Sequence, residues 1–209
     1  MPAFSNINTG YKEQAAPVSV SFHTSGVGLL ASAVALTKLV LEEKPGLVIQ
    51  AGIAGCFDND AVLGGVFVIA EEMLGDTGVE ENGHWIDLFD LKLQQPDNPP
   101  FTDKVLPNPW LQKFNLLLLP TARGITVNEI TASTHRREQL IKKYNPFVES
   151  MEGAALHYTC LQQGIPFLQV RAISNYIGER DKSKWKMKDA IVNLNEALLD
   201  LIEAVKSET

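Results

Sequence analysis

The stretch VESMEGAA, residues 148–155, decides how the rest of this sequence is read, together with VRAISN at residues 170–175. The first stretch places a carboxylate, Glu152, where a short apolar segment meets a helix, and the second ends an apolar run with polar groups. In an α/β sheet, ligands bind just outside the carboxyl ends of the strands. Two polar strand ends of this kind predict a binding site that both segments share.

Working outward, apolar runs alternate with helical segments along most of the chain. Several of these runs are continuous rather than alternating, as buried parallel strands are. The pattern predicts an α/β fold in which a mostly parallel sheet is covered by helices on both faces. The predicted strands are residues 18–22, 47–49, 66–70, 124–127 and 167–170; the predicted helices are residues 29–43, 134–144, 152–163 and 188–206.

Two further segments are expected to lie outside these elements. The glycine-rich residues 52–55 read as a tight turn after the second strand. Residues 94–109 contain five prolines and read as a long excursion outside the core.

The bulk composition indicates one soluble α/β domain, residues 1–209, with residues 1–17 irregular. The 209 residues are 45% hydrophobic and show no internal shift in composition. The net charge of −7, with both signs interspersed, argues against nucleic acid or a membrane surface as the partner. No apolar run reaches the ~20 residues that span a bilayer. With only Cys56 and Cys160, no disulfide scaffold is expected, and a cytoplasmic location follows.

Two glycine motifs are candidate ligand contacts. In SGVG, residues 25–28, backbone amides at a helix N-terminus could hold an anion or polar ligand, or the motif could be only a turn. GIAG, residues 52–55, has the same two readings. No Lys or Arg lies between Lys44 and Lys92, so a site lined by this motif is expected to be poor in cations and to use water rather than phosphate.

The polar residues of the two opening stretches also have two readings each. Glu152 could be a first-turn glutamate favoured by the helix dipole, or a carboxylate that accepts hydrogen bonds from a sugar. Asn175 could be a turn residue or a ligand contact. Arg171 lies inside an apolar strand and needs a partner, for which a carboxylate near the site is the candidate. The four histidines do not cluster, so no metal centre is expected.

Taken together, four motifs resemble those of the purine nucleoside phosphorylase and nucleosidase family, from about residue 18 to the C-terminus. They are SGVG (25–28), QAGIAG (50–55), MEGAA (151–155) and RAIS (171–174). The resemblance implies a three-layer α/β/α sandwich with a mixed, mostly parallel sheet and a homodimer or larger homo-oligomer. It also implies a small purine nucleoside as substrate, and no metal or organic cofactor.

The resemblance further implies roles for single residues. Glu152 would bind the ribose hydroxyls, Met151 would pack against the sugar, and Asn175 would face the purine, with Glu152 and Asn175 as the catalytic pair. The remaining substrate contacts implied are Ser25, Gly26, Gly52, Ile53 and Ser150, with Val127, Asn128, Glu129 and Thr131 lining the base pocket.

Within the family, three local features are similar to those members that hydrolyse futalosine, a nucleoside of a menaquinone pathway. They are GDTGVE at 75–80, ITVN at 125–128, and Asn175-Tyr176, where adenosine-type nucleosidases carry Asp. Two alternatives remain open. One is a nucleosidase for methylthioadenosine or adenosylhomocysteine, and the other is a catalytically silent nucleoside-binding protein.

The chemistry of Asn175 favours a 6-oxopurine. Cleavage of the N-glycosidic bond leaves negative charge on the base, which departs more easily once N7 carries a proton. A 6-oxopurine then presents a donor at N7 beside an acceptor at O6, and a carboxamide offers the matching acceptor and donor. This contact is stronger in the transition state than in the ground state, which is the condition for catalysis. The sequence therefore predicts that the released base is hypoxanthine.

The start of the chain departs from the family pattern. Family members begin with an additional apolar strand and a helix that carries a water-activating acid, and neither is recognisable before Gly26. We therefore expect a sheet without the family's first strand. The three readings are a late start or truncation, a substitute acid such as Glu71 or Glu72, and binding without turnover.

Overall fold

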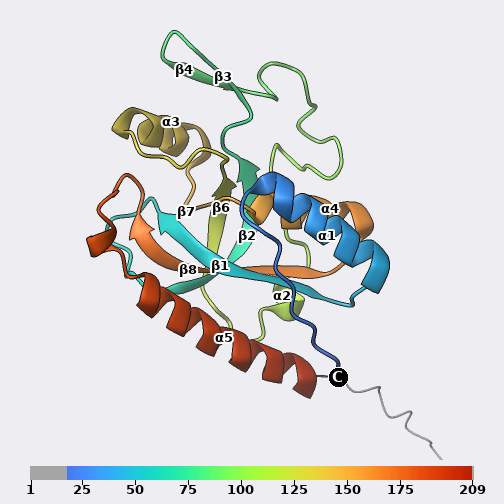
Figure 1. Cartoon of the computed structure of the whole chain (residues 1–209). Coiled ribbons are helices and arrows are strands. Elements are labelled where there is room, and N and C mark those ends of the chain that lie inside the picture. The colour runs from blue at the N-terminus through green and yellow to red at the C-terminus, as the bar shows by residue number, and fades with distance from the viewer. Residues whose placement is uncertain (1–17, 209) are drawn as a thin grey trace, which may run out of the picture.

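The computed structural model describes residues 18–208 as a sheet surrounded by helices (Figure 1). The prediction that residues 1–17 are irregular lies outside these residues. The strands are β1 (Val48–Cys56), β2 (Val66–Leu74), β3 (Gly78–Glu81), β4 (His84–Asp87), β5 (Leu106–Pro107), β6 (Thr121–Thr126), β7 (Val148–Ser150) and β8 (Phe167–Tyr176). The helices are α1 (Leu29–Glu43), α2 (Leu111–Phe114), α3 (Thr134–Tyr144), α4 (Gly153–Gln163) and α5 (Met187–Ser207), with a short 3₁₀ turn at Lys182–Lys184.

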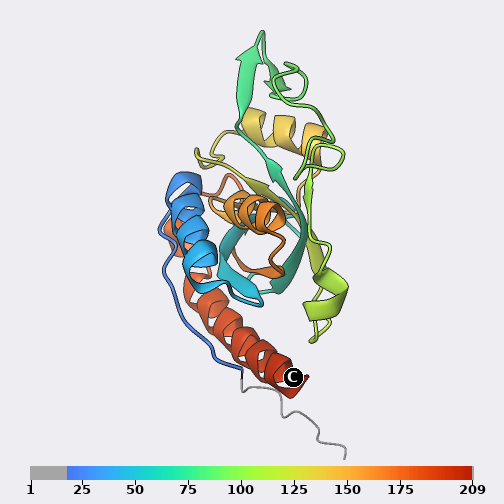
Figure 2. The ribbon, with the colours of Figure 1, turned by 90° about the vertical axis from the view of Figure 1, so that its right-hand side faces the viewer.

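Six strands form one mixed sheet in the order β5-β2-β6-β7-β1-β8. The pairs β1–β8, β2–β6 and β6–β7 are parallel, and the shorter β1–β7 and β2–β5 pairs are antiparallel. An additional antiparallel pairing joins β2 to β8, so the sheet curls back on itself. Strands β3 and β4 form a separate hairpin that projects from the sheet near α3 (Figures 1 and 2).

Helices cover the sheet on different sides, as the sequence predicted. Helices α1 and α4 pack together over the start of β1 and β8, around Leu36, Val40, Leu156 and Phe167. Helix α5 covers the other face of β8, where Ala190, Leu194 and Leu201 meet its apolar side chains (Figure 2). The prediction of a mixed α/β fold with helices on both sides is confirmed; the β2–β8 pairing was not foreseen.

Capping residues in the sequence predicted where the helices begin and end. Ser133 accepts a hydrogen bond from the Arg136 amide at 3.2 Å and caps α3. Gly164 ends α4 with a φ of 65°, a conformation that costs glycine little. The strand signals were weaker, and β1, β2 and β8 all run several residues beyond their predicted bounds.

Two predictions about local structure are wrong. Residues 18–22 are not a strand, because the structure places no neighbouring strand beside them, and Val20 and Phe22 are 44% and 84% exposed. Residues 52–55 are not a turn but the last part of β1. Their glycines are needed for close approach, since a Cβ on Gly52 would lie 2.3 Å from Nη1 of Arg171.

The proline-rich residues 94–109 form an excursion, as predicted, but they do contribute to the core. Leu106 is fully buried and Phe101 is 5% exposed, and the two pack with Phe89 and Ala154. Prolines favour turns in the backbone, but the residues between them can still be buried.

One edge of β1 is open over most of its length. Strand β7 pairs with β1 only at Gly55 and Cys56, so residues 48–54 have β8 on one side and no strand on the other within the described part of the chain. Backbone groups on an unpaired edge are free to meet a ligand or another segment. This edge borders the candidate site.

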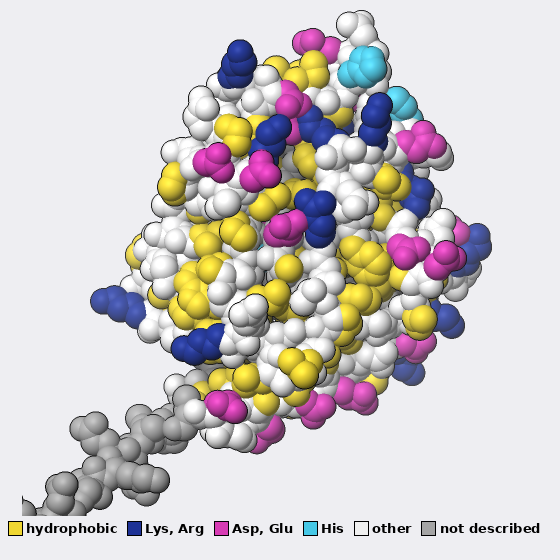
Figure 3. Space-filling view, turned by 180° about the vertical axis from the view of Figure 1, so that it is seen from behind, with side chains coloured by type: hydrophobic (Ala, Val, Ile, Leu, Met, Phe, Trp, Pro, Cys, Tyr) yellow, Lys and Arg dark blue, Asp and Glu magenta, His cyan; other side chains and the backbone are white. Residues whose placement is uncertain are grey.

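The face of the molecule seen in Figure 3 mixes both charge signs. Seen from behind, hydrophobic side chains lie across the middle of the molecule, with acidic and basic side chains around and between them (Figure 3). None of the helices in the described range has the length and apolar character needed to cross a membrane. The homo-oligomer implied by the family resemblance stays a prediction.

Candidate active site

The site begins with a bulge at the end of β8. Ala54 of β1 pairs with Ile173, but the next residue, Gly55, pairs with Asn175, so Ser174 is an extra residue without a partner on β1. A bulge of this kind turns the following side chain to the other face of the sheet. The carboxamide of Asn175 lies beside the end of β1, with Nδ2 3.4 Å from where a Cβ on Gly55 would be.

The carboxamide of Asn175 is held by its neighbours. The Ser174 hydroxyl donates to Oδ1 at 2.8 Å, and Nδ2 donates to the Tyr176 carbonyl at 3.1 Å. An amide has two acceptor positions and two N–H donors. These two bonds leave one acceptor position on Oδ1 and one N–H on Nδ2 for a ligand.

Glu152 lies at the junction between β7 and α4. Its Oε1 accepts the Gly28 amide at 3.1 Å, and its Oε2 lies 3.4 Å from Nη1 of Arg171. The Ser150 hydroxyl accepts the Gly153 amide at 3.2 Å and caps α4, so Glu152 itself makes no side-chain cap. The carboxylate is thus oriented by two distant segments and is not satisfied by its own helix.

Arg171 projects from β8, lies against Gly52 of β1, and is 3% exposed. Besides Glu152, it donates from Nη2 to Oε1 of Gln50 at 2.9 Å. The prediction that its partner is a carboxylate near the site is confirmed. Burial lowers the pKa of Arg171, against the raising influence of Glu152 and Glu72. The site is poor in cations, as predicted, but it is not without one: Arg171 comes from β8 and lies against Gly52.

These groups line one cavity of about 440 Å³, a size that suits a small organic ligand. Eight of the residues predicted from the sequence line this cavity: Ser25, Gly26, Gly52, Ile53, Ser150, Met151, Glu152 and Asn175. Among its described lining residues, Arg171 is the one Lys or Arg. That cation is already engaged by Glu152 and Gln50.

The loop from Val127 to Thr131 contributes less directly than expected. Only Ile130 of this loop lines the cavity. Val127 is buried, and its amide donates to the Ser150 carbonyl at 3.0 Å. The amides of Asn128 and Glu129 both donate to Asp76, and the Thr131 amide donates to Glu149 at 3.1 Å. The loop is therefore fixed by Asp76 and Glu149, with Ile130 turned toward the cavity.

Sequence reasoning missed several residues that line the cavity, of which Glu149, Gln50 and Trp185 carry polar groups. Glu149 belongs to the quoted stretch at 148–155, and its place in an otherwise buried strand was a usable signal. Gln50 opens the quoted motif QAGIAG, which was a signal of the same kind, whereas Trp185 gave none, because it reaches the cavity from the turn before α5.

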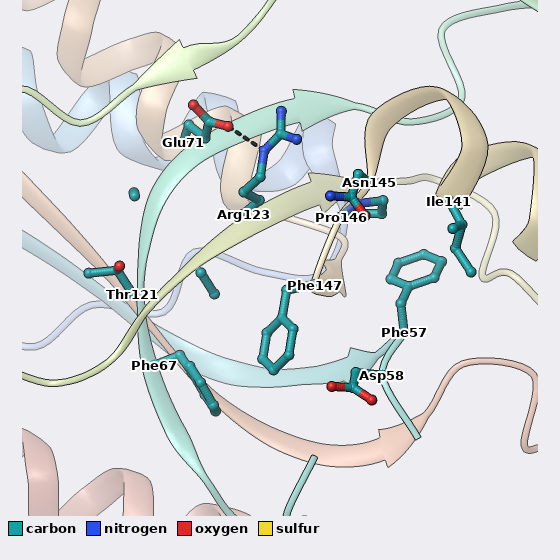
Figure 4. Close-up of a pocket in the computed structure, with 12 residues that line it drawn as sticks. Phe57, Asp58, Phe67, Glu71, Thr121, Arg123, Ile141, Asn145, Pro146 and Phe147 are labelled. Carbon is teal, nitrogen blue, oxygen red and sulfur yellow. Dashed lines mark hydrogen bonds and ion pairs between the residues drawn. The ribbon is translucent and has the colours of Figure 1, made fainter. Parts of the chain in front are cut away.

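Neither substitute acid considered from the sequence lines this cavity. Glu72 is fully buried behind Gly153; its Oε1 accepts the Thr126 hydroxyl at 3.0 Å, and burial raises its pKa to about 7. Glu71 points into a second cavity of about 650 Å³, where it pairs with Arg123 (Figure 4). That larger cavity is bordered by Phe67, Phe147 and Phe57 and contains none of the predicted site residues.

A methyl group at Gly52 is expected to dismantle the site. In Gly52→Ala, the new Cβ would lie 2.3 Å from Nη1 of Arg171, so the guanidinium has to leave Glu152 and Gln50. Overpacking together with a displaced buried charge costs roughly 2–4 kcal/mol. Thermal unfolding measures this loss. Gly46→Ala is the matched control, because a Cβ there meets nothing within 4 Å, and equal melting temperatures for the two variants would contradict the arrangement.

Comparison with known proteins agrees with this architecture. The futalosine hydrolase of Thermus thermophilus is 26% identical over 185 residues, which cover 85% of this chain and 79% of that protein. The solved structure of a futalosine hydrolase mutant of Helicobacter pylori aligns with a TM-score of 0.68 and 18% identity, covering 88% of this chain and 78% of the other.

A methylthioadenosine/adenosylhomocysteine nucleosidase of Colwellia psychrerythraea, solved with adenine, aligns with a TM-score of 0.69 and 21% identity, over 86% of this chain and 76% of that one. These structural likenesses establish the fold. The family model described as the phosphorylase superfamily matches residues 5–206, nearly the whole sequence. The resemblance inferred from the four motifs is confirmed, and the chain belongs to the phosphorylase superfamily.

Proposed function

We propose that this protein is a nucleosidase that hydrolyses the N-glycosidic bond of futalosine and releases hypoxanthine. The observation that carries the proposal is the pairing of two held side chains in one cavity, Asn175 and Glu152. Asn175 has one acceptor and one donor left for the base, and Glu152 has a carboxylate poised for the sugar. Two curated relatives named futalosine hydrolase, 26% and 27% identical, support the choice of substrate.

The base is recognised best after it has gained a proton. As the bond from C1′ to N9 breaks, its electron pair passes to the purine, and N7 takes a proton. N7–H then donates to the free acceptor position of Asn175 Oδ1, while O6 accepts from Nδ2. Before protonation N7 is an acceptor and faces another acceptor. The interaction therefore favours the departing base over the bound substrate.

Glu152 acts on the sugar. A carboxylate accepts hydrogen bonds from two adjacent ribose hydroxyls, and its charge opposes the positive charge that develops on the sugar ring. The Gly28 amide and Arg171 hold each of its oxygens in place, so little reorganisation is needed when that charge appears. Water bonds to C1′ through its oxygen and loses one proton to the solvent, which balances the proton that N7 takes up, so the products are the free sugar and neutral hypoxanthine.

Water rather than phosphate is the proposed acceptor, although Arg171 lies in the cavity. Arg171 is the one Lys or Arg among the described lining residues, it is 3% exposed, and its charge is already paired with Glu152, so the cavity presents little positive charge to a phosphate. We expect release of base from futalosine to proceed at the same rate with and without inorganic phosphate. Chromatography of the free base checks this, and strict dependence on phosphate would show a phosphorylase instead.

The same assay separates the rival substrates. Incubation with futalosine, inosine and methylthioadenosine should release hypoxanthine from the first and little or no adenine from the last. Release of adenine alone would favour a methylthioadenosine nucleosidase. If no base is released while futalosine still raises the melting temperature, the protein binds nucleosides without turning them over.

A further inference from the structure

Glu72 is a buried carboxylate that the proposed mechanism leaves unused. It lies in β2, is fully buried, and is not among the described residues that line the cavity with Glu152. Its Oε2 lies against two glycines: a Cβ would come within 2.4 Å of it at Gly124 and within 2.3 Å at Gly153. Gly153 is the residue that follows Glu152. The two glycines therefore make room for an acid directly behind the site.

Thr126 connects this acid to the start of α4. Its hydroxyl donates to Oε1 of Glu72 at 3.0 Å and accepts the Ala154 amide at 2.8 Å. The hydroxyl thus serves as donor and acceptor at once. Since α4 begins one residue after Glu152, the bond between Thr126 and Glu72 helps to fix the backbone that carries the Glu152 carboxylate.

Arg171 is the charged group that acts most strongly on Glu72. Burial raises the pKa of Glu72 to about 7, and Arg171, on β8, opposes this more than the hydrogen bonds of Glu72 do. His157, on α4, is neutral in this range, because burial lowers its pKa to about 4. Strands β5 and β6, which flank β2, place the uncharged Leu106 and Gly124 beside Glu72.

Arg171 is thus shared by two carboxylates. Burial lowers the pKa of Arg171, and the charges of Glu152 and Glu72 both oppose this effect. With Glu72 ionised, the three groups carry one excess negative charge, and Glu152 presents it to the cavity. With Glu72 protonated, the excess disappears and Arg171 acts on Glu152 alone. Buried charges are screened much less than exposed ones, so this difference extends to a sugar bound beside Glu152.

We propose that Glu72 is a positioning residue of the nucleosidase reaction, an inference that rests on the proposed function. Ionised Glu72 provides a second negative charge for Arg171, so that Glu152 keeps its own charge for the sugar. It also fixes the first turn of α4 through Thr126. As positive charge develops at C1′, this arrangement stabilises it without further reorganisation. Glu72 acts through Arg171 and Thr126 and does not touch the substrate.

The pH profile of the wild-type protein is the first test. We expect kcat for futalosine to rise about 10-fold between about pH 5.5 and about pH 8.5, with a midpoint near the pKa of Glu72, about 7. The stabilising contribution of Glu72 changes in the opposite direction. Its pKa is higher in the folded than in the unfolded chain, so that contribution is lost as the pH rises through about 7. Partial unfolding therefore cannot cause the rise in kcat.

Glu72→Gln removes the titrating group and keeps its shape. Its kcat should be about 10-fold below that of the wild type at about pH 8.5 and should not rise near pH 7, while KM stays within about threefold. Glu71→Gln is the matched control. It makes the same change one residue earlier in β2, where Glu71 pairs with Arg123 in the other cavity, and it should leave the rise in place.

Thr126→Val gives a second measurement, which decides the matter if Glu72→Gln does not fold. The hydroxyl that donates to the ionised carboxylate is lost, so the pKa of Glu72 should increase and the midpoint of the kcat profile should move up by about one pH unit. Thr126→Ser keeps the hydroxyl and should retain the wild-type midpoint.

Two results would overturn the role of Glu72. One is a rise in kcat near pH 7 that persists in Glu72→Gln, with any loss of rate equal at every pH, as expected for an acid that is only structural. The other is the same midpoint in Thr126→Val and Thr126→Ser. In both cases futalosine is still cleaved, and the proposed function stands. If the wild-type protein releases no base from futalosine at any pH, the proposed function itself fails.

Discussion

Glu152→Gln is expected to lower kcat/KM for futalosine by about 100- to 1000-fold, which corresponds to about 3–4 kcal/mol of transition-state stabilisation. The neutral amide is a poorer partner for ribose hydroxyls next to a cationic sugar, and it also leaves Arg171 without its carboxylate. Most of the loss should appear in kcat, because the charge of Glu152 matters most when the sugar becomes positive. Initial rates of base release over a range of substrate concentrations measure both parameters.

In Glu152→Gln, a lower rate caused by unfolding has to be distinguished from one caused by weaker stabilisation of the transition state. Thermal unfolding of Glu152→Gln should still show a cooperative transition, with a lower melting temperature because a buried charge has lost its partner. Glu203→Gln is a suitable control, since Glu203 pairs with Lys206 at 2.8 Å on the exposed side of α5. Rates within threefold of the unaltered protein would reduce Glu152 to a helix-start residue.

Asn175→Asp should invert the base preference. An ionised carboxylate is an acceptor only and offers O6 no donor, whereas a carboxylic acid can donate to N7 of a 6-aminopurine and accept from its amino group. Each mismatched buried pair costs ~1–3 kcal/mol. We therefore expect the ratio of kcat/KM on inosine to that on adenosine to fall by about 100-fold, with both substrates assayed on both proteins.

The environment of Asn175 makes this result specific. The Ser174 hydroxyl now donates to Oδ1 and would equally donate to a carboxylate, so the variant keeps one of its present contacts. Asn59→Asp makes the same chemical change on an exposed turn and should leave the ratio unaltered. A ratio that stays the same in Asn175→Asp would remove the base-selection argument altogether.

Local sequence signals were sufficient for the helices. Residues 29–43 and 134–144 form helices with the predicted bounds, because composition and capping residues such as Ser133 act within a few residues along the chain. The strands were harder to delimit. Gly52 and Gly55 look like turn residues in the sequence, and they are strand residues because Arg171 and Ile177 occupy the space that side chains would fill.

The residues of the candidate site likewise include some that the sequence indicated and others that only the structure revealed. Glu152 and Asn175 could be singled out because each ends a recognisable motif, and both line the cavity. The loop at residues 127–131 was assigned to the base pocket as a block, but the structure turns only Ile130 toward the cavity. The amides of Glu129 and Thr131 donate to the carboxylates of Asp76 and Glu149, which lie outside the loop, and these bonds fix which side chain faces inward.

The sequence by itself determined the α/β class, the helices, the family and the two residues at the centre of the proposed chemistry. Each of these depends on residue types and spacings that act locally or are read as a motif. Only the tertiary structure decided that Ser174 bulges, that Arg171 lies under Gly52, and that Glu149 and Asn175 flank Gly55. Those facts depend on the register between strands, which arises from packing and backbone pairing across more than a hundred residues and leaves no trace in any single segment.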